Sequence, residues 1–205
     1  MTGRAFLWDS CVLYRWLNGV PNEYVDHIGK YLDESRGGHL QIFYSTITLA
    51  EVRPSKVNKP GLTAREIIDG VNGTLIPVTP SPDIMDLAGR LRDARYRHIN
   101  GPEKQAAQRD LSLGDAIHLA TGIALREEYG VQGLALHTFD RGKRKDSEAG
   151  KKTVPLIGYE NWCRDCKDDE DVQRAIDLPK LEPEHPLCKR PTVTNSPASE
   201  KLPEN

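Results

Sequence analysis

Short apolar runs, most of them ending at an acidic or hydroxyl residue, alternate along this chain with amphipathic helical segments. The runs at 5–8, 40–44 and 133–138, with a weaker one at 75–78 that Pro77 interrupts, are typical of buried strands. The segments expected to form helices are 12–17, 24–34, 48–52, 64–71, 82–97 and 116–128. Strands joined through helices of this length pair in parallel, so the sequence predicts a three-layer α/β/α sandwich with a mostly parallel central sheet.

The sequence changes character after Tyr159. Residues 165–171 are acidic, and residues 178–205 are rich in proline, glutamate, lysine and serine. Segments of this composition bury too little apolar surface to offset the entropy lost on folding. We therefore expect one domain at 1–159 and an acidic, proline-rich and partly disordered C-terminal extension at 160–205.

The overall charge of -2 at pH 7 neither supports nor excludes a nucleic-acid substrate. The N-terminal stretch MTGRAFLWDSC has too short an apolar run for a secretory signal, and no later run approaches the roughly 18 apolar residues of a membrane span. We expect a cytoplasmic protein with no membrane association, whose cysteines are reduced thiols.

Four acidic residues are expected at one edge of the sheet. Asp9 and Asp140 directly follow strands, Glu51 comes shortly after the second strand, and Asp115 stands at the start of the helix 116–128. Ligands bind at the carboxyl ends of parallel strands, so these side chains are expected to converge. Clustered carboxylates raise one another's pKa unless a cation lies between them, and oxygen ligands suit Mg2+ or Mn2+. Such a centre activates water for phosphodiester hydrolysis.

Each of these acids also has a structural interpretation. Asp115 and Glu51 both follow a hydroxyl residue by three positions, which is the spacing of a helix capping box. Asp9 can cap the helix that follows it, and Asp140 can form a turn. The two roles are compatible, because one carboxylate oxygen can accept a backbone hydrogen bond while the other faces a metal.

Three polar neighbours of the acids are candidates for supporting roles. His118 follows Asp115 by three residues and is either a general base or a packed, hydrogen-bonded structural histidine. Ser10 and Thr138 stand beside two of the acids and are expected to donate hydrogen bonds that orient them.

A run of cationic residues directly follows Asp140. It either neutralises RNA phosphates near the scissile bond or belongs to a solvated loop. The residues of the run are Arg141, Lys143, Arg144 and Lys145, with Lys151 and Lys152 after them.

Two pairs of residues with the same short gap lie in the C-terminal region: Cys163 with Cys166, and His185 with Cys188. Together they are a possible tetrahedral zinc set. The acidic and proline-rich residues between the pairs favour uncoordinated thiols instead.

Four segments resemble, in this order and at these separations, the conserved blocks of PIN domains, especially the VapC-type bacterial toxins. They are LWDSCVL, YSTITLAEV, LSLGDAIHLATG and LHTFDRG, and VPLIGYEN from Val154 resembles the family's closing strand. The resemblance implies a PIN-like fold and an Mg2+- or Mn2+-dependent endoribonuclease. In it, the acids at Asp9, Glu51, Asp115 and Asp140 would bind the metal and activate water for cleavage of RNA.

The resemblance also implies partners. VapC-type proteins are toxins of type II toxin–antitoxin pairs, they commonly form homodimers, and an antitoxin protein fills the acidic cleft, often with a basic residue. The alternative function is a non-catalytic PIN-like module that binds RNA or protein for regulation. A phosphotransfer domain requires a second acid next to Asp9, where Ser10 and Cys11 stand instead.

Overall fold

The computed structural model describes residues 4–19, 23–57, 59–71, 74–98, 111–141, 153–163 and 166–184. The strands in these ranges are β1 (Arg4–Trp8), β2 (Leu40–Ser45), β3 (Leu75–Val78), β4 (Leu134–His137) and β5 (Lys180–Leu181). The helices are α1 (Ser10–Asn18), α2 (Glu23–Arg36), α3 (Thr48–Glu51), α4 (Ala64–Asp69), α5 (Pro82–His98), α6 (Leu113–Glu127), α7 (Tyr159–Trp162) and α8 (Glu170–Asp177), with a 3-10 turn η1 (Pro54–Val57).

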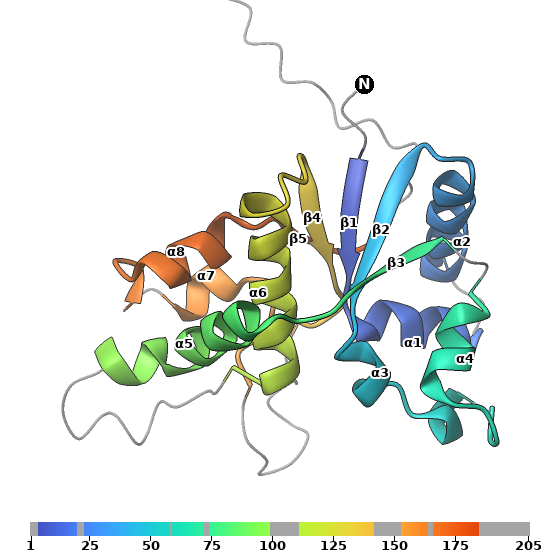
Figure 1. The fold of residues 1–205 in the computed structure, drawn as a ribbon, viewed down its shortest axis with the longest axis horizontal. Helices are drawn as coiled ribbons and strands as arrows, with labels where there is room; N and C mark the ends of the chain where they lie inside the picture. Colours follow the sequence, from blue (N-terminus) through green and yellow to red (C-terminus); the bar gives the residue numbers. More distant parts are fainter. Residues whose placement is uncertain are drawn as a thin grey trace, which may run out of the picture.

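The five strands form one sheet in the order β3-β2-β1-β4-β5, with β1 at the centre (Figure 1). Every pairing is parallel, and in the central register Phe6 lies beside Ile42 of β2 and Ala135 of β4. Parallel neighbours cannot be joined by a tight hairpin, so helical connections carry the chain across the sheet. The three-layer α/β/α class with a parallel central sheet is confirmed.

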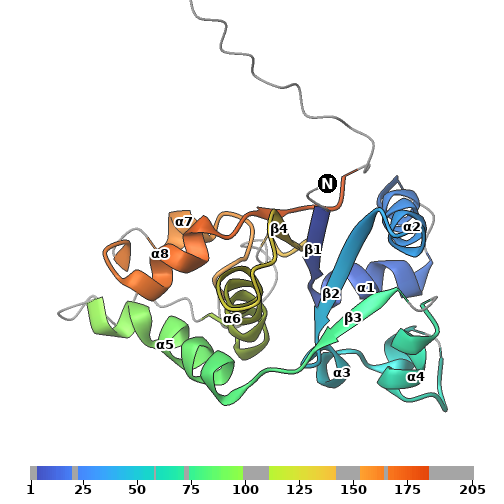
Figure 2. The ribbon, with the colours of Figure 1, turned by 45° about the horizontal axis from the view of Figure 1, so that its top comes forward.

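The two faces of the sheet are covered by different helices (Figure 2). Alternate residues of β1 point to opposite faces, as the two-residue period of a strand requires. Ala5 and Leu7 are buried in a core with α5, α6 and α8. Phe6 and Trp8 are buried in a second core with α1 and α2. Both faces are therefore apolar, and the polar residues that follow the strands lie at the carboxyl ends of the strands.

The C-terminal region differs from the expectation. Residues 166–184 pack into the domain: Val172 and Leu178 are fully buried, and Leu136 of β4 donates to the carbonyl of Pro179 (2.8 Å). Because α8 buries an apolar face against the core, the described part of the expected extension belongs to the fold. The closing strand is β5, whereas the segment from Val154 that was expected to fill this role contains α7 instead.

The acidic residues of this region have a local reason. Asp169 is the N-cap of α8, and its carboxylate accepts hydrogen bonds from the backbone amides of Asp171 and Val172 (3.1 and 3.2 Å). Acids at a helix N-terminus satisfy amides that lack partners within the helix. A composition that indicated disorder therefore begins a helix here. Over the described ranges, none of the helices combines the length and the apolar composition needed to cross a membrane.

Candidate metal centre

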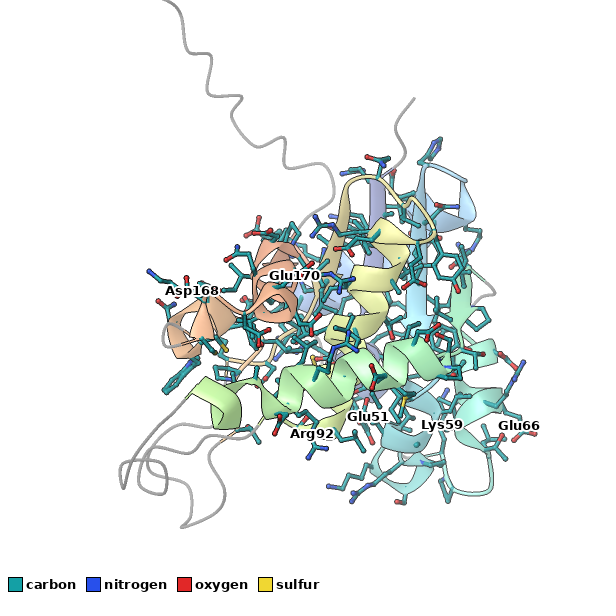
Figure 3. The ribbon with its side chains drawn as sticks, turned by 60° about the vertical axis from the view of Figure 1, so that its left-hand side comes forward. Glu51, Lys59, Glu66, Arg92, Asp168 and Glu170 are labelled. Atoms are coloured by element: carbon teal, nitrogen blue, oxygen red, sulfur yellow. The ribbon has the colours of Figure 1, made fainter. Side chains whose placement is uncertain are left out.

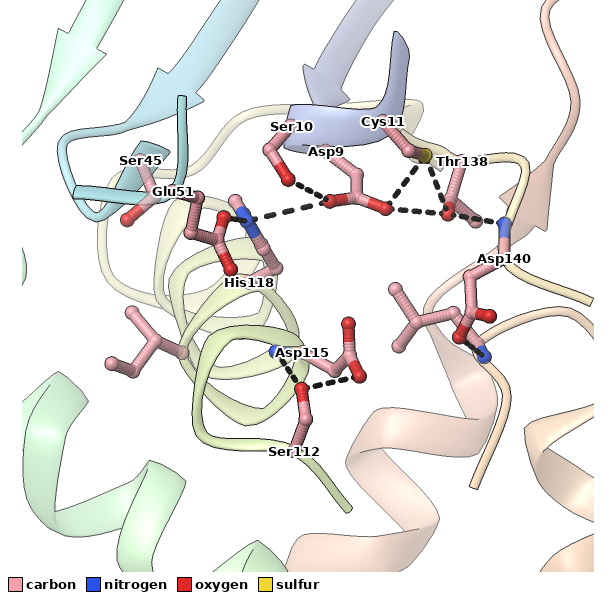
Figure 4. A network of polar contacts seen from close by, with 12 residues as sticks. Asp9, Ser10, Cys11, Ser45, Glu51, Ser112, Asp115, His118, Thr138 and Asp140 are labelled. Carbon is pink, nitrogen blue, oxygen red and sulfur yellow. Dashed lines mark hydrogen bonds and ion pairs between the residues drawn. The ribbon is translucent and has the colours of Figure 1, made fainter. Parts of the chain in front are cut away.

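Asp9 directly follows β1, and its buried carboxylate lies at the carboxyl end of this central strand. Its backbone occupies the N-cap position of α1, but its side chain makes no capping hydrogen bond. Instead, Thr138 donates to Oδ2 (2.7 Å) and Ser10 to Oδ1 (3.2 Å), while the Cys11 thiol donates to Oδ2 (2.9 Å). The capping role predicted for this carboxylate is wrong, and Ser10 and Thr138 lie where supporting donors were expected (Figure 4).

Glu51 reaches the same place from the end of α3. The N-cap of α3 is Ile47, which makes no side-chain cap, and the hydroxyl of Thr48 has no hydrogen-bond partner among the described residues. The predicted Thr48–Glu51 capping box is therefore wrong, and the Glu51 carboxylate is available for other contacts. Tyr14 of α1 fixes the end of α3 by donating its hydroxyl to the Glu51 carbonyl (2.8 Å).

His118 lies between these two carboxylates. Its Nε2 is 3.0 Å from Glu51 Oε2 and 3.5 Å from Asp9 Oδ1, and the ring is fully buried in α6. Burial lowers the pKa of His118, but the Glu51 hydrogen bond and the charges of Asp9, Glu51 and Asp115 outweigh it and leave the pKa raised. Ligand atoms of Asp9, Glu51 and His118 all lie within 4.8 Å of one another, which is a suitable arrangement for one metal ion.

Gly114 leaves room for Glu51, a contact that the sequence analysis missed. A Cβ built on Gly114 would overlap Glu51 Oε1 and lie 3.1 Å from its Cδ. Any larger residue at the start of α6 would displace the carboxylate. A glycine one position before Asp115, inside a helix start, is the only signal that the sequence offers.

Asp115 enters the centre from the first turn of α6. Ser112 is the N-cap: its hydroxyl oxygen accepts from the Asp115 amide (3.1 Å) and its proton is donated to Asp115 Oδ2 (2.5 Å). The Ser112 half of the predicted capping box is present, whereas the Asp115 carboxylate bonds the Ser112 hydroxyl and not its backbone amide. This carboxylate points toward Asp9 (Figure 4). Burial raises the pKa of Asp115 to about 7, with contributions from the charges of Asp9 and Asp140 and against the lowering effect of the Ser112 bond.

Asp140 lies on the other side of Thr138. Its amide donates to Thr138 Oγ1 (3.0 Å), its Oδ2 accepts from the Leu156 amide (3.0 Å), and its carbonyl accepts from the Ile157 amide (2.9 Å). Asp140 therefore fixes the segment around Leu156 and adds negative charge near Asp115. It does not belong to the set whose ligand atoms lie within 4.8 Å of one another.

Some of the remaining candidate residues lie within the described ranges and others lie outside them. Arg141 is exposed and its Nε donates to Glu182 Oε1 (2.5 Å). Cys163 and Cys166 are buried in the core, with Cys166 Sγ 3.4 Å from the Cys163 carbonyl. The other predicted cations and the second half of the zinc set lie outside the described residues: Lys143, Arg144, Lys145, Lys151, Lys152, His185 and Cys188.

Among the residues that the structure describes, no acidic residue of the C-terminal region belongs to the set whose ligand atoms lie within 4.8 Å of one another. Figure 3 shows Asp168, which precedes α8, well apart from Glu51. The acidic cluster thus consists of residues that follow β1, β2 and β4 or begin α6.

Comparison with known proteins gives little beyond this chain itself. No protein-family model matches the sequence, and no curated protein matches it. Among solved structures, the chain is similar to one in the structure of FitAB bound to IR36 DNA fragment. The identity is 15%, the match covers 87% of this chain and 94% of that chain, and the TM-score is 0.43. A similarity this weak carries no argument about function. The fold and the candidate centre are therefore described from the sheet order and the side chains of this chain itself.

Proposed function

We propose that this chain is a metal-dependent endoribonuclease that hydrolyses RNA phosphodiester bonds at the edge formed by Asp9, Glu51, Asp115 and Asp140. The observation that carries the proposal is the convergence of Asp9, Glu51 and His118, whose ligand atoms lie within 4.8 Å of one another. Two of these residues, Asp9 and Glu51, have sequence positions that also allow a capping role, and neither carboxylate forms a cap. Carboxylates that converge on one another instead of capping helices suggest that they share a ligand.

The residues fit a hard divalent cation. Carboxylate oxygens from Asp9 and Glu51, with Asp115 nearby, are ligands that suit Mg2+ or Mn2+, and His118 Nε2 orients the Glu51 carboxylate through its bond to Oε2. When bound, such an ion acidifies a water for attack on phosphorus and neutralises charge on the phosphate. Burial is the main cause of the raised pKa of Asp115, and the charges of Asp9 and Asp140 raise it further. A cation bound between these carboxylates would reduce the same repulsion.

The chain's own side chains supply the positioning. Thr138 and Ser10 hold the two oxygens of Asp9, and His118 holds Oε2 of Glu51 against Gly114. Ligands fixed in this way lose little freedom when a cation binds. Asp115 stands at the helix N-terminus, where backbone amides favour an anion such as a substrate phosphate.

The PIN-domain resemblance extends the proposal to partners. We propose that the chain is the toxin of a type II toxin–antitoxin pair and that its antitoxin places a basic side chain at the acidic edge. A homodimer belongs to the same proposal. Co-purification of a small protein encoded beside this gene, with loss of RNA cleavage on binding, is the expected result.

The test is cleavage of a mixed pool of structured RNAs by the purified protein with Mg2+, Mn2+ or EDTA. We expect cleavage only with metal, and we expect Asp9→Asn to reduce the rate by at least about 100-fold, the scale for removing one group that stabilises transition-state charge. Asn keeps the size of Asp9 and can still accept from Thr138, so the fold should persist.

The matched control is Asp168→Asn, which removes the same charge far from the centre. It should cleave at the wild-type rate. Equal cleavage by Asp9→Asn and wild-type protein would overturn the assignment of the centre. RNA binding of equal strength with Mg2+ and with EDTA, together with no cleavage of any RNA in the pool, would favour the non-catalytic binding module.

A further inference from the structure

A carboxylate from the C-terminal region lies among cationic and aromatic side chains beside the acidic edge. Glu182, which follows β5, accepts from Arg141 Nε at Oε1 (2.5 Å) and from the Tyr24 hydroxyl at Oε2 (3.4 Å). The guanidinium carbon of Arg15 lies 3.8 Å from the ring centroid of Phe139 and 4.9 Å from that of Tyr24. The two rings meet edge to face at 5.1 Å.

The charges of this cluster are not balanced. Two guanidinium groups, from Arg15 and Arg141, face the single carboxylate of Glu182. The Arg141 hydrogen bond lowers the pKa of Glu182, with further lowering from the charge of Arg15, and outweighs the opposing effect of burial. The carboxylate therefore stays ionised, and the cluster keeps a net positive charge.

The cluster adjoins the candidate metal centre through covalent neighbours. Phe139 stands between Thr138, which binds Asp9, and Asp140, and its amide donates to Cys11 Sγ (3.1 Å). The Thr138 amide donates to the Leu181 carbonyl (2.9 Å), so Glu182 lies at the same edge of the sheet. An RNA strand bound at the metal centre would therefore place flanking phosphates close to the guanidinium groups of this cluster.

We propose that Arg15, Tyr24 and Arg141 form a subsite for an RNA backbone phosphate and that Glu182 occupies this subsite in place of the phosphate. The proposal rests on the proposed function, because it assumes RNA as the ligand of the acidic edge. Guanidinium groups bind carboxylate and phosphate oxygens with the same planar array of donors, so one anion can replace the other.

The exposure of the two partners favours exchange. The Arg141 side chain is 69% exposed, whereas that of Glu182 is 16% exposed. Ion pairs with such an exposed member contribute little to stability, so a phosphate can displace the carboxylate at small cost. Aromatic rings beside a cationic group, here Phe139 and Tyr24, are a common arrangement for binding single-stranded RNA.

The test is binding of a fluorescein-labelled, single-stranded RNA pool in EDTA, where no metal-dependent cleavage occurs. Glu182→Gln removes the competing charge and should bind RNA about 2- to 5-fold more tightly than wild type. The slope of log affinity against log salt concentration should steepen by about 0.7, the value for one additional phosphate contact with a single strand. Adding Arg141→Gln to Glu182→Gln should abolish the gain.

The control is Glu184→Gln, which removes the same charge two residues further on, at an exposed position. Equal gains from Glu182→Gln and Glu184→Gln, or no gain from Glu182→Gln, would overturn the subsite. A lower melting temperature for Glu182→Gln with unchanged RNA affinity would also overturn it, because Glu182 would then only fasten the C-terminal strand.

The outcomes for the two proposals are separate. Metal-dependent cleavage by the wild-type protein, with no effect of Glu182→Gln on binding, removes the subsite and leaves the ribonuclease. Tighter binding by Glu182→Gln without cleavage of any RNA supports the subsite and removes the ribonuclease.

Discussion

Carboxylates in two regions of this molecule have opposite surroundings. Between α5, α6 and α8, Asp171 accepts from Arg90 Nε (2.7 Å) and from Arg174 Nη1 (3.1 Å), and Glu127 accepts from Arg174 Nη2 (2.5 Å). Both of these carboxylates have a guanidinium partner within the chain. These ion pairs join α8 to its neighbours and complete the packing of the C-terminal region.

The carboxylates at the strand ends lack such partners. Within the described ranges, no lysine or arginine forms an ion pair with Asp9, Glu51 or Asp115, and the nearest cationic group is His118. The charges of Asp9 and Asp140 instead help to raise the pKa of Asp115. The ion-paired acids between the helices stabilise the fold, whereas the charges at the strand ends that lack a guanidinium partner lower its stability. Acids of the latter kind are typical of functional sites.

The largest effect on stability is expected from Asp115→Asn. The pKa of Asp115 is raised from 3.8 to about 7, so its carboxyl group is more easily ionised in the unfolded chain than in the folded one. Stability from the protonated form is fully present below about pH 4 and is lost as pH rises through about 7. At about 1.4 kcal/mol per pKa unit, ionisation costs up to about 4 kcal/mol above pH 7.

Asn at this position cannot ionise. In EDTA, Asp115→Asn should therefore melt with the wild-type protein near pH 4 and at a higher temperature above pH 7. Thermal unfolding between pH 4 and 8.5 measures the difference. Adding Mn2+ should raise the melting temperature of the wild type and have a smaller effect on the variant. A variant less stable than wild type at pH 8 would contradict the contrast between the two regions.

A smaller effect, on activity alone, is expected from Gly114→Ala. The added Cβ would overlap Glu51 Oε1, so the carboxylate must leave its present position. Displacing a ligand through its supporting contacts costs about 10- to 100-fold in metal affinity or activity. Alanine within a helix is itself favoured over glycine by about 0.5–1 kcal/mol, so the melting temperature should not fall by a comparable amount.

Gly89→Ala is the matched control for this change. Gly89 lies in α5, and a Cβ there meets no atom within 4 Å. It should raise stability and leave RNA cleavage and metal affinity unchanged. Equal activity of Gly114→Ala and Gly89→Ala would show that the position of Glu51 does not matter for cleavage.

The sequence predicted the features that depend on local patterns. The apolar runs that alternate with helical segments predicted a parallel sheet. The acids placed after those strands predicted that Asp9 and Glu51 meet. The overlap of Gly114 with Glu51 could not be predicted, because it depends on how closely α3 approaches α6. The bond between Glu182 and Arg141 joins residues 41 positions apart in sequence and depends on the pairing of β4 with β5.

The C-terminal helix and strand were missed for a different reason. In α8 the charged residues outnumber the buried residues Val172 and Ala175, so average composition indicates disorder. The strand β5 has only two residues and shows no alternating pattern. The partners that hold Asp171, on α5 and on α8 itself, become visible only when the helices are packed.

The smallest effect is expected from Asp171→Asn, which is the same chemical change as Asp115→Asn in the other region. The variant loses the charge that binds Arg90 and Arg174, so stability at pH 7 should fall by about 1 kcal/mol, the upper range for partly exposed ion pairs. RNA cleavage should not change. Urea unfolding at low and high salt measures the loss, which should shrink as salt screens the pairs. If Asp171→Asn instead stabilised the protein as Asp115→Asn is expected to, the two regions would not differ in how their carboxylates are compensated, and the acids at the strand ends would need another explanation.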